Sequence, residues 1–212
     1  MAKRVVPELL GAGCSLLALK LEAVFLHSAL SLDRSWASAF GEAPVHSKML
    51  RELCLVDCGL RGPLPELRLP ALRALHLSFN QINGGLGSLT GCLALQQLDL
   101  SDNQLVGDLD ALKGCTALRE LCLTLNQLVG DLDALKGCTS LRSVDLSHNQ
   151  LSGGLAALRG CTALRQLSLS YNDLTGDLHA LRGCRALQTL AMDNNRLTGD
   201  LWPLRDCTAL QV

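Results

Sequence analysis

The sequence predicts an α/β-type repeat solenoid, a curved rod with a parallel β-sheet on its concave face and short helical or irregular segments on its convex side. Three observations support this prediction. The ten residues GDLDALKGCT occur at 107–116 and again at 130–139. From Leu50 onward the pattern L-x-x-L-x-L recurs every 23 residues, after a first step of 22. Nearly half of the 212 residues are apolar but only 3% are aromatic, so leucine supplies most of the core.

The first part of each repeat unit predicts a short strand. In L-x-x-L-x-L the leucines alternate with other residues, which is the period-two pattern of a strand with one buried side. A single unit cannot bury its leucines alone, so neighbouring units must stack in parallel with their strands about 4.8 Å apart. The units begin at leucines of one register, namely Leu50, Leu72, Leu95, Leu118, Leu141, Leu164, Leu187 and Leu210.

An asparagine follows the strand in six units. Its amide can donate and accept hydrogen bonds, so it can satisfy backbone groups that are freed where the chain turns out of the strand. Cys58 takes this position in the first unit. We therefore expect a structural asparagine ladder made of Asn80, Asn103, Asn126, Asn149, Asn172 and Asn195.

The duplicated decapeptide is predicted to form the return segment on the convex side. Gly107 permits a tight bend there. Asp110 suits the first turn of a short helical piece, Lys113 its last turn and Gly114 its C-terminal end. The decapeptide is therefore scaffold and is not expected to carry a reaction.

These repeats resemble the leucine-rich repeat family over about three quarters of the chain. The L-x-G-x-L element is similar to the plant-type subclass, most fully in LRGPLPEL at 60–67. Later units lack its proline and have a shorter period, so the subclass stays open. The resemblance implies that a ligand meets the concave strand face.

The spacing of the ten cysteines does not indicate a disulfide framework. Paired cysteines would not recur singly at one fixed period, so we expect buried, reduced thiols that act as small hydrophobic side chains in a reducing compartment. No C-x-x-C pair is present, and neither a metal nor another cofactor is expected. The recurring cysteines are Cys92, Cys115, Cys138, Cys161, Cys184 and Cys207.

Charge and the N-terminal composition limit the partners. A net charge of −1 argues against nucleic-acid binding, which normally needs a strongly basic domain. Pro7, Glu8, Lys20 and Glu22 interrupt the apolar residues near the N-terminus, so neither a signal peptide nor a membrane span is expected. The chain also lacks an Asn-x-Ser/Thr sequon. These observations predict a cytoplasmic protein.

Two columns of the strand face are candidates for charged contacts with a protein partner. Arginines that follow the first leucine of a unit could clamp an acidic partner through bidentate bonds. Alternatively, they were inherited by duplication and are solvated beside carboxylates that offset their charge. The candidates are Arg73, Arg119, Arg142 and Arg165, with Asp99 and Asp145 from the middle column of the face.

The column just before the asparagines contains two of the few aromatic residues of the chain. Exposed aromatic side chains in a groove are typical interface anchors. Alternatively, these side chains fold over the strand ends and pack locally. The candidates in this column are Phe79, Leu125, His148 and Tyr171.

The same face does not predict an enzyme. Cys122 as a nucleophile would need a base, but His76 lies two units away, about 10 Å at strand spacing and beyond hydrogen-bond reach. A nucleophile elbow, a P-loop and a dinucleotide fingerprint are all missing from the sequence.

The two ends depart from the repeat of residues 50–212. Residues 1–49 are predicted to form an N-terminal helical cap or a small module. In a second interpretation, VPELL at 6–10 and DRSW at 33–36 resemble the F-box, a module that docks ubiquitin-ligase scaffolds, although its expected second turn is missing. That resemblance implies docking through Pro7, Leu9, Leu10 and Trp36.

At the C-terminal end, Trp202, Pro203 and Asp206 make the last unit irregular. We expect its face to be undercapped, so that the chain is a fragment or that face meets a partner or a second copy. Three functions follow as hypotheses: a non-catalytic module that binds a protein on its concave face, an F-box-like adaptor of a ubiquitin ligase, and a fragment of a receptor ectodomain.

Overall fold

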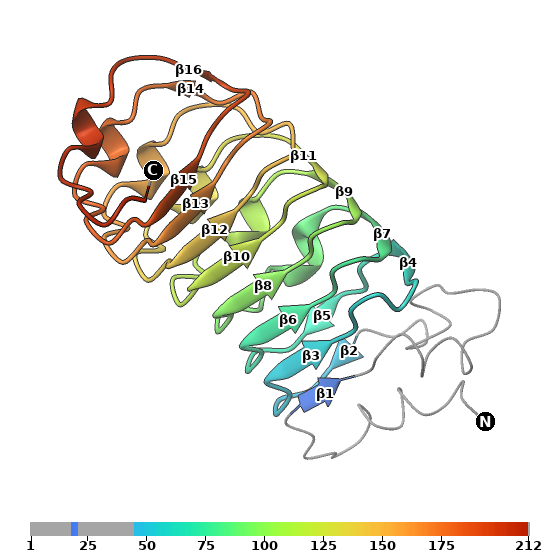
Figure 1. Cartoon of the computed structure of the whole chain (residues 1–212). Helices are drawn as coiled ribbons and strands as arrows, with labels where there is room; N and C mark the ends of the chain where they lie inside the picture. The colour runs from blue at the N-terminus through green and yellow to red at the C-terminus, as the bar shows by residue number, and fades with distance from the viewer. Residues whose placement is uncertain (1–17, 21–44, 212) are drawn as a thin grey trace, which may run out of the picture.

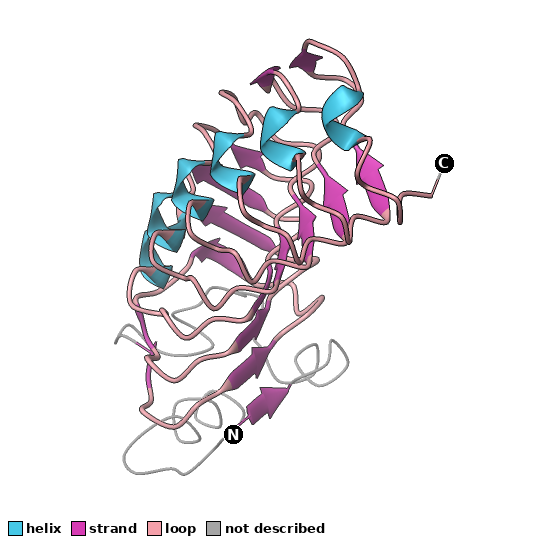
Figure 2. Cartoon of the chain, turned by 90° about the vertical axis from the view of Figure 1, so that its left-hand side faces the viewer, coloured by secondary structure: helices cyan, strands magenta, loops and turns pink. Residues whose placement is uncertain are grey.

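The computed structural model describes residues 18–20 and 45–211. The repeat units stack one upon another along a single axis, and equivalent strands of successive units lie side by side (Figure 1). Seen from the side, the short helices follow one another along the opposite flank of the solenoid (Figure 2). The predicted curved solenoid with a parallel sheet is confirmed.

A parallel sheet of eight strands forms one face of the solenoid, in the order β1-β3-β6-β8-β10-β12-β13-β15. The strands pair in register, so that Leu98, Leu121 and Val144 are direct partners. Each strand is three residues long, and from β3 to β15 its central residue points inward. The strands are β1 (Ala18–Lys20), β3 (Glu52–Cys54), β6 (Ala74–His76), β8 (Gln97–Asp99), β10 (Glu120–Cys122), β12 (Ser143–Asp145), β13 (Gln166–Ser168) and β15 (Thr189–Ala191).

Further strands of two to four residues lie outside this sheet, and the sequence pattern did not reveal them. Their residues also alternate, because Gln81 and Asn83 are exposed while Ile82 between them is buried. They form a four-stranded sheet of β4 (Arg61–Pro63), β7 (Gln81–Gly84), β9 (Gln104–Gly107) and β11 (Gln127–Leu128), and the pairs β14 (Thr175–Gly176) with β16 (Arg196–Leu197) and β2 (Val45–His46) with β5 (Leu67–Arg68).

The return segments contain one-turn 3₁₀ helices, as the decapeptide predicts. Asp110 begins η3, Lys113 follows its end, and Gly114 takes a positive φ of 87° there. The carboxylate of Asp108 accepts the N–H of Asp110 at 3.0 Å, which caps the helix start. The helices are η2 (Leu86–Leu89), η3 (Asp110–Leu112), η4 (Asp133–Leu135), η5 (Ala156–Leu158), η6 (His179–Leu181) and η7 (Trp202–Leu204).

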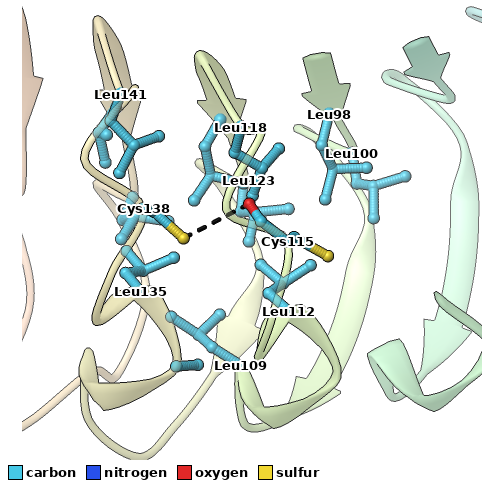
Figure 3. Close-up of a cluster of buried hydrophobic side chains, with 14 of the residues drawn as sticks. Leu98, Leu100, Leu109, Leu112, Cys115, Leu118, Leu123, Leu135, Cys138 and Leu141 are labelled. Carbon is cyan, nitrogen blue, oxygen red and sulfur yellow. Dashed lines mark hydrogen bonds between the residues drawn. The ribbon is translucent and has the colours of Figure 1, made fainter. Parts of the chain in front are cut away.

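The leucine core runs without interruption through the stacked units. The first leucine of every unit from Leu50 to Leu187 is fully buried. The recurring cysteines pack among these leucines, and Cys138 donates its thiol hydrogen to the carbonyl of Cys115 at 3.5 Å (Figure 3). Burial raises the pKa of the Cys115 and Cys184 thiols to about 11. All nine described cysteines are free, so the predicted column of thiols is confirmed.

The asparagine ladder joins each unit to the one before it. The Asn126 amide donates to the carbonyls of Leu123 and Thr124 in its own unit and of Leu100 in the preceding unit, at 3.1, 3.3 and 3.0 Å. Its Oδ1 accepts the N–H of Leu105, also in the preceding unit, at 2.9 Å. The predicted role is confirmed, and the amide bridges two units as well.

At the N-terminal end, β1 extends the large sheet by pairing with β3. Most of the segment predicted as a helical cap, and all the residues of the F-box resemblance (Pro7, Leu9, Leu10 and Trp36), lie outside the described residues. Both interpretations stay predictions.

At the C-terminal end the leucine core becomes partly exposed. The guanidinium of Arg205 lies 3.7 Å from the centre of the Trp202 ring, and the guanidinium of Arg182 lies 5.1 Å from it. Leu190, which pairs with the buried Leu167, is only half-buried. Self-association through this face stays a prediction.

Replacing Asn126 with alanine should lower the free energy of unfolding by about 2 kcal/mol, because the buried N–H of Leu105 loses its acceptor and three carbonyls each lose one of their two donors. Urea denaturation followed by circular dichroism measures this change. The neighbouring exposed Gln127→Ala is the control and should change stability by less than about 0.5 kcal/mol. Equal effects of the two variants would contradict the ladder's role.

Stability should fall between about pH 9 and pH 11. The pKa of Cys115 and Cys184 is raised from 9.0 to about 11, so unfolded thiols ionise near pH 9 while folded ones stay protonated. Their contribution is therefore fully present below pH 9 and is lost as the pH rises through 11. The urea midpoint at pH 8 and pH 10.5 tests this, and the loss should be smaller in C115A/C184A.

Candidate functional site

The outward face of the large sheet presents two side chains from each strand. In β10, Leu121 points into the core, so Glu120 and Cys122 on either side of it face outward. Because the strands pair in register, these outward residues form two straight columns across the sheet. The middle column therefore brings His76, Asp99, Cys122 and Asp145 together on adjacent strands, as the repeat spacing predicts.

The face is hollowed along these columns. A hollow of about 420 Å³ is lined by residues of five consecutive strands, from β6 to β13. A second hollow, of about 260 Å³, continues over β12, β13 and β15. Outward side chains that line the first are His76, Gln97, Asp99, Glu120, Cys122, Ser143, Asp145 and Gln166.

The predicted site did not include one column of the residues that line this hollow. Gln97 donates to the Glu120 carboxylate at 3.0 Å, and Ser143 donates to the Gln166 side-chain oxygen at 3.1 Å. These residues occupy the third position of each unit and recur at the same period, so the sequence alone could have identified them.

The two predicted aspartates of the face bond to their own chain. Asp99 accepts the hydroxyl of Ser101 at 2.7 Å and its N–H at 3.0 Å. Asp145 makes the same pair of bonds with Ser147, at 2.6 and 3.0 Å. Both carboxylates are therefore held in fixed positions at the ends of their strands.

The four predicted arginines lie at the N-terminal ends of strands in the sheet. Arg73, Arg119, Arg142 and Arg165 immediately precede β6, β10, β12 and β13, and all four are exposed. Their backbone is fixed by the sheet, because the N–H groups of Arg142 and Arg165 each donate at 2.8 Å to the carbonyl of the preceding arginine in this column.

The column before the asparagines has an unusual backbone. Phe79, Leu125, His148 and Tyr171 all have φ between 53° and 58°, in the left-handed region. Residues with a Cβ rarely adopt this backbone conformation, which costs about 1 kcal/mol or more per residue. The other units have Asp57, Asp102 and Asn194 at this position, residue types that tolerate it better.

The side chains of this column are both exposed and locally packed. Phe79, Leu125 and Tyr171 are 58%, 45% and 50% exposed. The rings of His148 and Tyr171 stack at 4.3 Å with an angle of 12° between their planes. Two side chains of this column therefore pack against each other, while the apolar residues still present an edge to solvent. Their role as interface anchors stays a prediction.

Ionisable groups of the middle column lie on separate strands. His76 and Cys122 pair with Asp99 from opposite sides, so one strand separates them, and no hydrogen bond joins His76 to any of these side chains in the described residues. Residues 18–20 and 45–211 contain no cluster of three or more His, Cys, Asp or Glu side chains that could hold a metal ion.

Sequence comparison identifies the repeats. Residues 70–114, 93–137 and 139–183 each match the family model described as leucine-rich repeats (2 copies). These segments together span more than half of the chain. The chain belongs to the leucine-rich repeat family. Leucine-rich repeat proteins generally act as non-catalytic interaction modules, and no curated protein matches the chain in sequence.

Solved structures of other leucine-rich repeat proteins resemble the fold. A plant peptide hormone receptor, RGFR1 in complex with RGF2, is 30% identical with a TM-score of 0.70, over 76% of this chain and 27% of the receptor chain. The ectodomain of the receptor kinase GASSHO1/SCHENGEN3 from Arabidopsis thaliana, in complex with CASPARIAN STRIP INTEGRITY FACTOR 2, is 28% identical with a TM-score of 0.62, over 74% of this chain and 22% of its own.

The likeness to a bacterial protein concerns only the fold. Internalin C2 from Listeria monocytogenes is 22% identical with a TM-score of 0.61, over 75% of this chain and 77% of its own. This leucine-rich repeat chain spans about a quarter of the length of the plant receptors it matches. None of its described helices is long and apolar enough to cross a membrane.

Replacing Leu125 with asparagine should leave the free energy of unfolding unchanged or raise it by about 0.5 kcal/mol, because asparagine relieves the left-handed strain and little buried surface is lost. The control Leu123→Asn, at a fully buried position two residues earlier, should cost more than about 3 kcal/mol. Urea denaturation measures both, and a loss above 1 kcal/mol for Leu125→Asn would contradict the strain.

Proposed function

We propose that this leucine-rich repeat chain is a non-catalytic binding module that holds a peptide or protein segment on its concave sheet face. The observation that carries the proposal is the hollow of about 420 Å³ bordered by a column of exposed apolar side chains. Phe79, Leu125, His148 and Tyr171 follow the strands that line this hollow. An apolar border beside fixed polar groups is the usual composition of a protein interface.

The rigidity of the face also supports this proposal. Strand pairing, the leucine core and the asparagine ladder fix every outward position before a partner arrives, so little ordering cost remains on binding. The left-handed turn occurs in every unit and belongs to the fold. That large side chains (Phe79, Leu125 and Tyr171) occupy it, although they tolerate this backbone poorly, adds a second argument.

The partner is proposed to be peptide-like because several plant structures that the chain resembles were solved with peptide hormone ligands. RGFR1 was solved with RGF2, and the HAESA ectodomain was solved with an IDA peptide hormone ligand. The hollows extend across six strands, from β6 to β15, and therefore give an extended segment continuous contact.

Cytoplasmic location is part of the proposal, and the column of free buried thiols supports it. A receptor ectodomain is the second candidate function, favoured by the likeness to plant receptor ectodomains. Expression of the chain with a fluorescent fusion in plant cells distinguishes the two: the cytoplasmic proposal requires signal inside the cytosol, and passage into the secretory pathway would contradict it.

The concave face is tested by selecting binders from a random sixteen-residue phage-displayed peptide library on the intact chain. Affinity of the selected peptides should fall at least tenfold in the variant F79A/Y171A, because two aromatic anchors are removed. The control V106A/V129A removes side chains of comparable exposure, one within β9 and one directly after β11, and should change affinity less than twofold. The reverse pattern would place binding on the sheet that contains β9 and β11.

A further inference from the structure

The carboxylates of the concave face already have hydrogen-bond donors within the chain. Ser101 and Ser147 each donate twice, to Asp99 and Asp145, and Gln97 donates to Glu120. These neutral donors fix the position of each carboxylate, while its negative charge remains. The acidic groups of the face are therefore parts of the scaffold.

The arginine side chains at the N-terminal ends of the same strands have no such partners among the described residues. Arg119, Arg142 and Arg165 make no ion pair and no side-chain hydrogen bond with the rest of the described chain. Even Glu120, which directly follows Arg119, bonds to Gln97 instead. Elsewhere on the surface arginines do find carboxylates: Arg68 pairs with Glu66 at 2.9 Å, and Arg196 pairs with Asp173 at 2.7 Å.

These three arginines form a continuous row. They precede β10, β12 and β13, which are consecutive strands of the sheet, and such strands lie about 4.8 Å apart. Arg73 extends the row two strands further, with Gln96 between it and Arg119. Each guanidinium offers five N–H donors in a fixed fork, so the row presents a line of donors without acceptors.

We propose that this arginine row binds an acidic strip of the partner, so that the segment held on the concave face is an acidic peptide. The inference rests on the proposed function and deepens it. Carboxylates on one side of the segment meet Arg119, Arg142 and Arg165 through bidentate bonds, while its other side faces the hollow and the apolar border. The anionic groups are supplied by a peptide, since the net charge of −1 does not favour a nucleic acid.

Fluorescence anisotropy tests the row with three labelled twelve-residue probes: (Glu-Ser)₆, (Gln-Ser)₆ and (Lys-Ser)₆. Alternation places the six charged groups on one side of an extended peptide. The intact chain should bind (Glu-Ser)₆ at least tenfold more tightly than the other two, with affinity that weakens as salt is added. Variant R119Q/R142Q/R165Q should weaken this binding about tenfold or more.

The control variant K136Q/R159Q/R185Q removes the same three positive charges from exposed positions outside the concave face. It should retain the affinity of the intact chain within twofold, and circular dichroism should show both variants folded. Equal weakening by the two variants would overturn the proposal, because it would show diffuse attraction. The absence of saturable (Glu-Ser)₆ binding, equal binding of (Gln-Ser)₆, or tighter binding of a twelve-nucleotide oligothymidylate would also overturn it.

Failure here is distinguishable from failure of the proposed function. Peptides selected from the random library that lose affinity in F79A/Y171A but not in R119Q/R142Q/R165Q would leave the concave binding face in place and overturn the arginine row alone. Selected peptides that depend on neither set of residues would contradict both.

Discussion

Where each strand ends, the amide of one asparagine donates to backbone carbonyls that also accept a bond from a neighbouring asparagine or from a backbone N–H. For Asn126 these are carbonyls of Leu100, Leu123 and Thr124, one of which belongs to the preceding unit. A buried amide with three acceptors and one donor in fixed places tolerates no slip between units. The constant period, the in-register strands and the straight columns of outward residues all depend on this bond set.

The parts of the fold that repeat in sequence were the parts that could be predicted. Leucine alternation gives the strands, and single cysteines at one period indicate buried thiols because disulfides need pairs. The small second sheet escaped prediction, since β7, β9 and β11 each contain a single buried residue, whereas the L-x-x-L-x-L stretch of each unit has three inward positions. Likewise, Asp108 caps η3 from outside the helix, whereas helix-dipole reasoning considers only Asp110 within the first turn.

The candidate site was predictable in its columns but not in its backbone or its partnerships. Spacing alone placed Asp99, Asp145 and the arginines on one sheet. The left-handed conformation of Leu125 and Tyr171 has no local signal, because neither residue favours it; only Asp102 and Asn194 at equivalent positions indicate it. Which charges of the face are internally bonded also depends on side-chain geometry that composition does not contain. This geometry separates the carboxylates that bond within the chain from the arginines that have no side-chain partner among residues 18–20 and 45–211.

Contacts between units recur at fixed sequence offsets, as in the thiol of Cys138 on the carbonyl of Cys115 and that of Cys184 on Cys161. An added or deleted unit of 23 residues would meet neighbours that already present matching surfaces. The length of this protein is thus an adjustable quantity over evolutionary time. Gene duplication can extend its reach along a ligand in whole increments, without having to invent a new core.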